Sequence, residues 1–503
     1  MLITRFPALM EVLFYLLQDN ILLSYKNHTE KLHQIKSGQI SLTENINHFL
    51  HRIETFSRLN AFNSVFAEDA LTNAEHISQK IINGTAGKLA GMVVAVKDVI
   101  AIKDKPLTCS SKMLKDFTSL YDATVIERLK KEDAIIIGKT SCDEFAMGSS
   151  NENSAFGPVL NPIDNSRVPG GSSGGSAVAV AARLCDVSLG SDTGGSIRQP
   201  ASFCGIFGLK PTYGRVSRYG LTAFASSFDS IGPLANNTED IALVMSVIAG
   251  HDRLDSTSSE QPSSDYLSLA KDITISKNSR SGKPRIGIPK EYFGEGINPE
   301  VKSVIENFIE KLKTDGFEVK EISLPKTEFS IAIYYILTTA EASSNLARYD
   351  GARYGFRSDN SESMQQMYQT SRSGGLGSEV KRRIMLGTYV LSAGYYDAYY
   401  KKAQKVRRLL KEDFDNAFTQ ADLILTPTSP FAAFKLGEKS SDPLEMYLSD
   451  IYTTSANLAG IPGISIPVGR NSEGMPVGMQ LMANQFDEEM LLKISLYIEN
   501  NLL

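Results

Sequence analysis

The sequence predicts an α/β fold in which one large domain surrounds a central sheet. The composition is the first reason, because 42% of the 503 residues are hydrophobic and 22% are charged, so the chain can bury a large core. The second is the alternation of short apolar runs and helical segments from residue 88 onward. The third is that this alternation continues on both sides of a polar stretch, residues 252–283. We therefore expect a single domain.

The order of the elements follows from periodicity and from residues that begin or end helices. Residues 1–20 are interpreted as an N-terminal extension and residues 21–503 as one domain. That domain is divided into a helical lead-in (21–87), a segment that carries the chemistry (88–250), a polar surface excursion (252–283) and a remaining α/β part. Helices are expected to begin at Asp122 and at Asn298, and the second should end at Gly316. Strands are expected at residues 92–96, 134–138, 186–190, 285–289, 317–322, 421–427, 464–468 and 477–482.

Charge and cysteine usage exclude several classes of protein. The net charge is −5 and no run of lysines and arginines stands out, so any contact with nucleic acid is expected to depend mainly on a partner. The cysteines form no CxxC pair and have no histidine at ligand spacing, which argues against zinc and disulfides and fits a reducing cytoplasm. They are Cys109, Cys142, Cys185 and Cys204. No apolar run is long enough to span a membrane, and a signal peptide is not expected.

Two glycine- and serine-rich segments, residues 168–184 and 188–205, carry the densest turn signals in the chain. Flexible linkers would not run directly into apolar segments, and neither segment contains the lysine of a phosphate-binding loop. Gly170, Ser172 and Gly174 match the G-x-S-x-G pattern of a serine nucleophile. That pattern requires a histidine late in the chain, and only His251 follows these segments. The base must therefore be sought elsewhere.

Lys97 is the candidate base. It ends the apolar run 92–96, so its ammonium should emerge at the C-terminal edge of a buried strand. Burial favours the neutral amine, which can accept a proton near physiological pH. A lone lysine at a strand end is more often an ordinary side chain that reaches to solvent. The residues around Lys97 therefore leave both interpretations open.

The motifs GGSSGGSA and GSDTGGSIRQPA, with the KD dipeptide after a hydrophobic strand, resemble the amidase signature family from about residue 43 to the C-terminus. Lys97 precedes Ser172 by 75 residues, and Ser172 precedes Ser196 by 24. The resemblance implies that Ser196 is the nucleophile, Ser172 relays its proton and Lys97 is the final base. It also implies a mixed central sheet with helices on both faces and a cis peptide bond before Ser172.

The same resemblance implies an oxyanion hole in the second segment. Backbone N–H groups of the turn would hold the tetrahedral oxyanion, and its glycines would let the substrate carbonyl approach closely. The turn consists of Thr193, Gly194, Gly195 and Ser196.

Within the family, residues 209–234, 379–407 and 442–467 resemble the A, or glutaminase, subunits of glutamyl-tRNA(Gln) and aspartyl-tRNA(Asn) amidotransferases. Free glutamine must be recognised by its α-carboxylate and α-ammonium, which requires a fixed cation and a fixed carboxylate. The resemblance assigns these roles to Arg383 and Asp450, with Tyr334 as a further contact. The adjacent Lys381 and Arg382 are expected to be surface charges. Residues 149–154 depart from the family pattern, so the shape of the pocket mouth is not predicted.

The resemblance implies that the chain hydrolyses glutamine and supplies ammonia to a complex that converts Glu-tRNA(Gln) to Gln-tRNA(Gln). A B subunit would use ATP and Mg²⁺ and bind the tRNA, and a small C subunit would complete a cytoplasmic heterotrimer. No cofactor or metal is expected in this chain. A free-standing amidase acting on aryl or aliphatic amides is the first alternative. The second is a non-catalytic assembly protein, against which the intact set of Lys97, Ser172 and Ser196 argues.

Overall fold

The computed structural model describes residues 24–271, 282–294, 296–359, 361–440 and 442–503. The predicted extension, residues 1–20, lies outside these residues, as do residues 272–281 of the predicted polar excursion.

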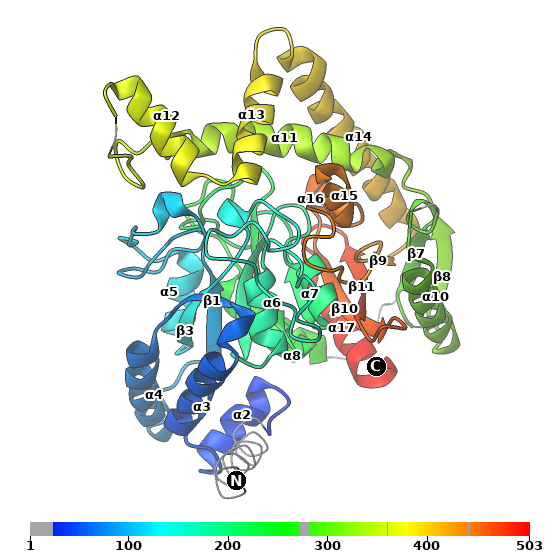
Figure 1. The fold of residues 1–503 in the computed structure, drawn as a ribbon. Helices are drawn as coiled ribbons and strands as arrows, with labels where there is room; N and C mark the ends of the chain where they lie inside the picture. Colours follow the sequence, from blue (N-terminus) through cyan, green and yellow to red (C-terminus); the bar gives the residue numbers. More distant parts are fainter. Residues whose placement is uncertain (1–23, 272–281, 295, 360, 441) are drawn as a thin grey trace, which may run out of the picture.

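The described residues form an eleven-stranded sheet in the order β1-β3-β2-β4-β6-β5-β10-β11-β9-β7-β8 (Figure 1). The strands are β1 (Phe62–Val65), β2 (Val93–Lys97), β3 (Ile135–Thr140), β4 (Val187–Asp192), β5 (Phe207–Lys210), β6 (Ser230–Ala235), β7 (Arg285–Pro289), β8 (Glu318–Ile322), β9 (Leu423–Pro427), β10 (Gly463–Arg470) and β11 (Pro476–Ala483). The sheet is mixed, since β2 runs parallel to β3 and β4 while β4 and β6 are antiparallel. A single large α/β fold with a mixed sheet is thus confirmed.

Helices surround this sheet (Figure 1). In the first half of the chain they are α2 (His28–Lys36), α3 (Leu42–Thr55), α4 (Ala67–Ile82), α5 (Thr124–Lys131), α6 (Gly174–Ala181), α7 (Arg198–Cys204), α8 (Thr238–Ile248) and α9 (Tyr266–Lys271). In the second half they are α10 (Pro299–Thr314), α11 (Ser330–Asn345), α12 (Met364–Gly375), α13 (Ser378–Leu391), α14 (Lys402–Gln420), α15 (Pro443–Tyr447), α16 (Thr454–Ala459) and α17 (Glu488–Leu502). None of the helices described is both long and apolar enough to cross a bilayer.

Side-chain alternation along β2 places helices on both faces of the sheet. Val93 and Ala95 belong to one buried cluster, which also contains apolar residues of α3, α4 and α6. Val94 and Val96 belong to another, with apolar residues of α5 and α8. Successive side chains of a strand point to opposite faces, so these two clusters cover the two sides of the sheet. The residue at the end of this buried strand is Lys97.

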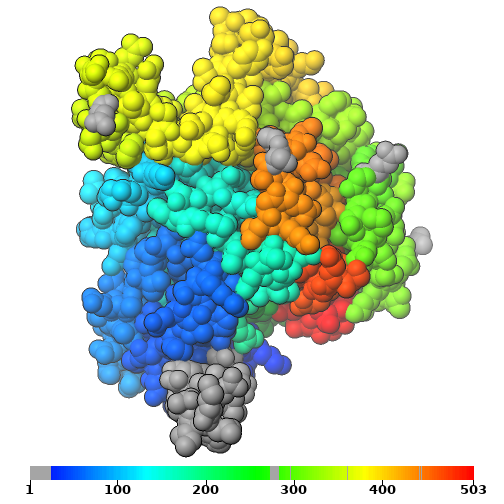
Figure 2. Space-filling view, in the orientation of Figure 1, coloured from blue at the N-terminus to red at the C-terminus, as the bar shows by residue number. Residues whose placement is uncertain are grey.

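A third group of helices lies along one side of the molecule. Helices α11, α13 and α14 lie together above the sheet, and Figure 2 shows α12 and the α13–α14 region standing out from the body. This group contributes Tyr334 on α11 and Arg383 on α13, so it brings two of the predicted substrate contacts to one side of the sheet.

The predicted strands all appear within one or two residues of their expected bounds, but three strands were missed. β1 interrupts the predicted helical lead-in, and it is a short edge strand without a buried residue. β5 has only four residues, and β6 contains Gly232 and Pro233, which count against a strand in any sequence-based prediction.

The two predicted helix starts have different outcomes. Asn298 caps α10 by accepting from Glu300 N–H, and Gly316 follows the helix with φ of 90°, so this prediction is confirmed. The prediction that Asp122 caps α5 is wrong, because the capping residue is Ala123 and makes no side-chain cap. Asp122 instead accepts hydrogen bonds from Lys103 N–H and Lys130 Nζ.

Candidate active site

The C-terminal ends of β2 and β4 position the chemistry. The two strands are parallel neighbours, with Val96 opposite Leu189, so the residues that follow them emerge at the same edge of the sheet. β2 ends at Lys97, and the turn 193–196 follows β4 directly. The loop 169–173 enters the same region because it leads into α6, which packs on both strands. All three segments predicted to carry the chemistry therefore converge.

Lys97 is fully buried and surrounded by hydroxyl groups. Its Nζ lies 2.7 Å from Ser172 Oγ, 2.9 Å from Ser173 Oγ and 2.9 Å from Ser191 Oγ. Burial lowers the pKa of Lys97 to about 8, although neighbouring acidic groups oppose the shift. A lysine with this pKa can exchange a proton with Ser172 near neutral pH, which is the property that the sequence analysis required of the base.

Ser196 is slightly more exposed to solvent than Ser172. Ser172 is wholly buried, whereas Ser196 is 7% exposed, so only the latter has surface through which a substrate can approach. Ser173 N–H donates to the Ser196 carbonyl at 3.2 Å and ties the two serine loops together. The peptide bond between Gly171 and Ser172 is cis, as the family resemblance implies. Of the three residues predicted to form the relay, Ser196 is thus the one that keeps exposed surface.

The turn after β4 presents backbone donors. Gly195 N–H donates to Asp192 Oδ1 at 2.9 Å, so this one of the four predicted oxyanion donors is already engaged. Within the described part of the chain, the N–H groups of Thr193, Gly194 and Ser196 have no hydrogen-bond acceptor. Three donors of the turn are thus available to a developing oxyanion.

A buried ion pair that the sequence analysis missed supports this turn. Arg198 and Asp192 are both wholly buried, and the guanidinium donates to both carboxylate oxygens. Burial alone would raise the pKa of Asp192, but Arg198 outweighs it and holds the pKa well below its usual range. Arg198 also donates to Thr453 O and Gln480 Oε1. The only sequence signal was an Asp and an Arg six residues apart within GSDTGGSIRQPA.

Arg383 is buried on the inner face of α13, unlike its neighbours. Its Nε donates to Glu379 Oε1 at 2.8 Å, and its side chain is 3% exposed. The rings of Phe224, Tyr335 and Tyr447 each lie between 5.2 and 5.6 Å from the guanidinium carbon. Of the two preceding residues, Lys381 is half-buried and Arg382 is exposed, although Arg382 also pairs with Glu379. A cation held this firmly away from bulk water is suited to bind an anion.

Asp450 is buried at the end of the short 3₁₀ helix η8 (Leu448–Asp450). Its Oδ2 accepts from Ser149 Oγ at 2.5 Å, while Oδ1 has no partner among the described residues. Burial raises the pKa of Asp450 to about 7, and Ser149 and Arg383 both oppose this rise. Ser149 lies in the segment 149–154 that departs from the family pattern, so that segment helps to build the site.

Tyr334 and the segment that contains Asp450 both contact the turn of Ser196. A Cβ atom on Gly194 would lie 2.5 Å from Tyr334 Cζ, so the tyrosine ring packs directly on this glycine. Thr453 Oγ1 donates to Gly194 O at 2.7 Å and to Asp450 O at 3.1 Å. The structure therefore brings Tyr334 and the segment of Asp450 to the turn that carries Ser196, although these residues are far apart in the sequence.

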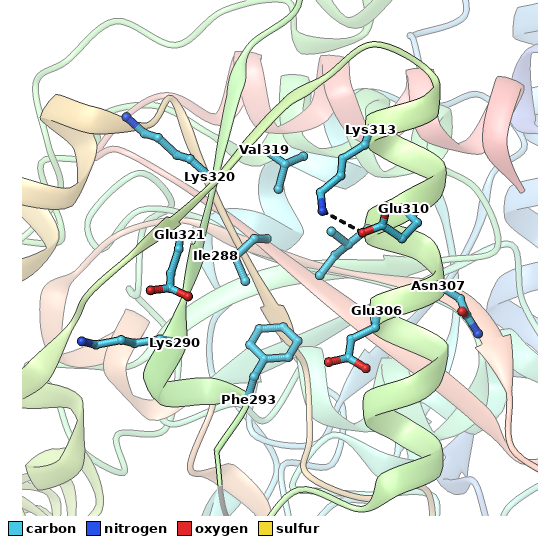
Figure 3. Close-up of a pocket in the computed structure, with 11 residues that line it drawn as sticks. Ile288, Lys290, Phe293, Glu306, Asn307, Glu310, Lys313, Val319, Lys320 and Glu321 are labelled. Atoms are coloured by element: carbon cyan, nitrogen blue, oxygen red, sulfur yellow. Dashed lines mark hydrogen bonds and ion pairs between the residues drawn. The ribbon is translucent and has the colours of Figure 1, made fainter.

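A cavity of about 600 Å³ elsewhere in the molecule is a poorer candidate. It lies between α10, β7 and β8, and charged residues of both signs line it (Figure 3). Glu310 and Lys313 of this lining pair with each other. The lining holds no serine or cysteine that could act as a nucleophile.

Comparison with known proteins agrees with the geometry. The amidase family model matches residues 44–492. The A subunit of the glutamyl-tRNA(Gln) amidotransferase of Chlorobium luteolum is 56% identical over 90% of this chain and 92% of its own length. Its counterpart from Prosthecochloris aestuarii is 54% identical over 95% of this chain and 98% of its own length. The crystal structure of the counterpart from Thermotoga maritima has a TM-score of 0.70 and 43% identity, covering 83% of this chain and 84% of that one. The chain therefore belongs to the amidase family.

Proposed function

We propose that this chain is the glutaminase component, the A subunit, of a glutamyl-tRNA(Gln) amidotransferase. It hydrolyses glutamine and supplies ammonia for the conversion of Glu-tRNA(Gln) to Gln-tRNA(Gln). The single observation that carries the proposal is that Arg383 and Asp450, both buried, lie within electrostatic reach of Tyr334, whose ring packs on Gly194 in the turn of Ser196. A general amidase needs the serine and the lysine, whereas a buried guanidinium and a buried carboxyl group whose Oδ1 has no partner among the described residues suit a substrate that carries both charges. Free glutamine carries both complementary charges.

The proposed reaction starts with two proton transfers. Lys97, as the neutral amine, accepts the proton of Ser172, and Ser172 accepts the proton of Ser196. At the same time, Oγ of Ser196 bonds to the side-chain amide carbon of glutamine. The turn N–H groups hold the oxyanion. The proton then returns through Ser172 to the amide nitrogen, the C–N bond breaks and ammonia leaves. Water attacks the resulting ester by the same route and releases glutamate.

The substrate is selected at its two ends. Asp450 Oδ1, which lacks a partner within the described residues, would accept a hydrogen bond from the α-ammonium of glutamine. The terminal nitrogens of Arg383 would bind the α-carboxylate, because Glu379 is engaged through Nε of the guanidinium. Tyr334 lies against Gly194 and would contact the substrate between these ends and the oxyanion turn.

The remaining parts of the reaction are assigned to partners. The curated relatives are named as subunits of an amidotransferase, which supports assembly of this chain into a complex. We assign ATP, Mg²⁺ and tRNA binding to a B subunit, while a C subunit completes the heterotrimer. A cytoplasmic location is part of the proposal, and the four free, buried cysteines are compatible with it.

The test is a glutaminase assay of the purified complex with the Ser196→Ala variant. Release of glutamate should be abolished, because the variant loses the nucleophile and little packing. Ser392→Ala, which removes an exposed hydroxyl beyond α13, is the matched control and should behave as wild type. Amidation of Glu-tRNA(Gln) driven by added ammonium salt should survive in Ser196→Ala, because ammonium bypasses this site. Near-normal glutamate release by Ser196→Ala would contradict the proposal. Failure of the ammonium-driven amidation in this variant would indicate that Ser196 has a role in assembly instead.

A further inference from the structure

Gln199, in the first turn of α7, carries a buried amide that the proposed mechanism does not use. Both ends of this amide bind backbone groups of other segments. Oε1 accepts a hydrogen bond from Gly171 N–H at 3.0 Å, and Nε2 donates to Ser149 O at 2.8 Å. A backbone N–H can only donate and a carbonyl can only accept, so these partners fix the orientation of the amide. Gln199 therefore bridges two separate loops.

The first of these loops carries the proposed bridging serine. Gly171 directly precedes Ser172, whose Oγ lies 2.7 Å from Lys97 Nζ. A Cβ atom on Gly170 would lie 2.4 Å from Gln199 Oε1, so this loop also packs directly on the amide. A shift of the loop would change the distance between Ser172 and Lys97, and proton transfer requires hydrogen-bond distance.

The second loop carries Ser149, which holds one of the proposed glutamine contacts. Ser149 Oγ donates to Asp450 Oδ2 at 2.5 Å, and Oδ1 of the same carboxyl group is the atom assigned to the α-ammonium of glutamine. Gln199 binds the backbone carbonyl of Ser149, so it fixes the position from which the serine hydroxyl reaches Asp450.

The two loops also pack on each other beside Gln199. A Cβ atom on Gly171 would lie 2.7 Å from Ser150 N and 2.9 Å from Asn151 N, so a side chain at this glycine would displace the second loop. Gln199 N–H donates to Gly195 O at 2.8 Å, which ties the residue to the turn after β4 as well. Closely packed interiors transmit small displacements, so the position of each of these segments depends on the others.

We propose that Gln199 is a positioning residue that couples the loop of Ser172 to the site of the α-ammonium of glutamine. The inference rests on the proposed glutaminase function. Gln199 itself contacts neither the substrate nor a reacting atom. An α-ammonium bound at Asp450 stabilises the loop of Ser149, and through Gln199 it stabilises the loop of Ser172. A substrate with this ammonium therefore gains in binding and in proton transfer.

The test compares glutamine with 4-carbamoylbutanoate, which has the same amide and carboxylate but lacks the α-ammonium. The measured quantities are kcat/KM of the purified complex for each substrate and the ratio of the two values, which does not depend on the amount of folded enzyme. Gln199→Met keeps the length of the side chain and removes both side-chain hydrogen bonds. We expect a loss of about tenfold for 4-carbamoylbutanoate and about a hundredfold for glutamine, so the ratio should fall about tenfold.

A second substitution at the same position guards against a failure of Gln199→Met to fold. Gln199→Asn keeps an amide in the buried site, but its side chain is one methylene too short to reach both loops. It should lower the ratio in the same direction.

Ser149→Ala identifies the loop that changes the ratio. This variant removes the hydroxyl that reaches Asp450, so it should lower kcat/KM for glutamine and spare 4-carbamoylbutanoate. Combined with Gln199→Met, it should lower the ratio no further than the larger single effect, because both substitutions act on the same contact.

Asn237→Leu is the matched control. Its buried amide also bridges two segments, since Oδ1 accepts from Asp240 N–H and Nδ2 donates to Lys26 O. Asn237 follows β6, whose end at Ala235 pairs with Val187 at the start of β4, so it lies at the opposite end of β4 from the active-site turn. This variant should lose stability and leave the ratio unchanged.

The outcomes separate the inference from the function on which it rests. Equal losses on the two substrates in both Gln199 variants would show a purely structural role and overturn the inference. A ratio that falls further in the double variant than in either single variant would overturn it too, because the two residues would then act independently. No loss in either Gln199 variant would overturn it and leave the glutaminase proposal intact. A wild-type complex that releases no glutamate from glutamine would overturn the glutaminase function itself, and the role of Gln199 with it.

Discussion

At the scale of single residues, the chemistry depends on the protonation state of Lys97. Burial disfavours its ammonium form and lowers its pKa to about 8, while three hydroxyl groups within 2.9 Å replace part of the lost hydration. Burial thus allows Lys97 to lose its proton near neutral pH. The hydroxyl groups around it hold the side chain in place. An arginine at this position would stay charged and could not release its proton.

This account predicts the pH dependence of the reaction. The base must be deprotonated to act, so kcat/KM for glutamine should rise with pH, level off above about pH 8 and fall nearly tenfold per pH unit well below it. Lys97→Arg should be inactive at every pH. A steady-state pH series on both proteins checks this prediction, and a flat profile between pH 6 and 9 would contradict the role of Lys97.

Substitutions of Lys97, Ser172 and Ser196 should also have non-additive effects on kcat. Lys97→Ala and Ser172→Ala should each impair glutamine hydrolysis severely, and combining either with Ser196→Ala should cost little more than Ser196→Ala alone. The measurement is kcat for the single and double variants under the same conditions. Losses that add on a logarithmic scale would mean that the residues have independent roles.

At the scale of elements, the active-site turn is fixed by contacts from distant segments. Arg198 at the start of α7 joins Asp192 at the end of β4 to Thr453 and Gln480 of the C-terminal part. The ionised Asp192 stabilises the fold because its pKa lies below the usual value. This contribution is fully present above the ordinary carboxyl pKa of about 4 and is lost as the pH falls below it.

Removing the cation of this pair should destabilise the protein. Arg198→Met leaves Asp192 buried without its partner, which should lower the free energy of unfolding by about 3–5 kcal/mol. Arg408→Met removes one side of an exposed pair with Glu412 and should cost less than about 1 kcal/mol. Urea denaturation of both variants at neutral pH measures the difference. Equal stabilities would show that the buried pair does not hold the turn.

Substrate choice also belongs to the scale of elements, because α13 and η8 each supply one charge. Arg383→Ala or Asp450→Ala leaves one charged end of glutamine unpaired, which should cost about 2–5 kcal/mol in transition-state binding. Slow turnover of a small neutral amide should change little. The comparison is kcat/KM for both substrates across wild type and the two variants. Parallel losses would mean a structural role, and no loss would favour the free-standing amidase.

Much of this architecture could be predicted from the sequence, and the failures have physical causes. Periodic apolar runs located eight strands, but β6 was missed because Pro233 lies opposite Leu189 in the sheet, where proline is rare. The contact of Lys97 with Ser172 followed from the family motifs. The partners of Arg198 did not, because Gln480 is 282 residues away and no local pattern marks such a contact.

At the scale of the whole molecule, one continuous sheet connects the proposed relay to the proposed glutamine contacts. Lys97 ends β2 and Ser196 follows β4, which are neighbours in the first half of the sheet order, whereas Thr453 and Asp450 belong to the segment that joins β9 to β10 in the second half. Helices α11 and α13 cover this region from one side and supply Tyr334 and Arg383 (Figure 1). The proposed nucleophile and the proposed glutamine contacts therefore belong to the same fold rather than to separate domains.

The central claim is that Ser196 carries the glutamyl group during turnover. The direct measurement is rapid acid quenching of the complex during glutamine hydrolysis, followed by mass spectrometry of its peptides. We predict a glutamyl ester on the peptide that contains Ser196, and we predict its absence in Ser196→Ala. A glutamyl group on another residue, or one that persists in Ser196→Ala, would contradict the account.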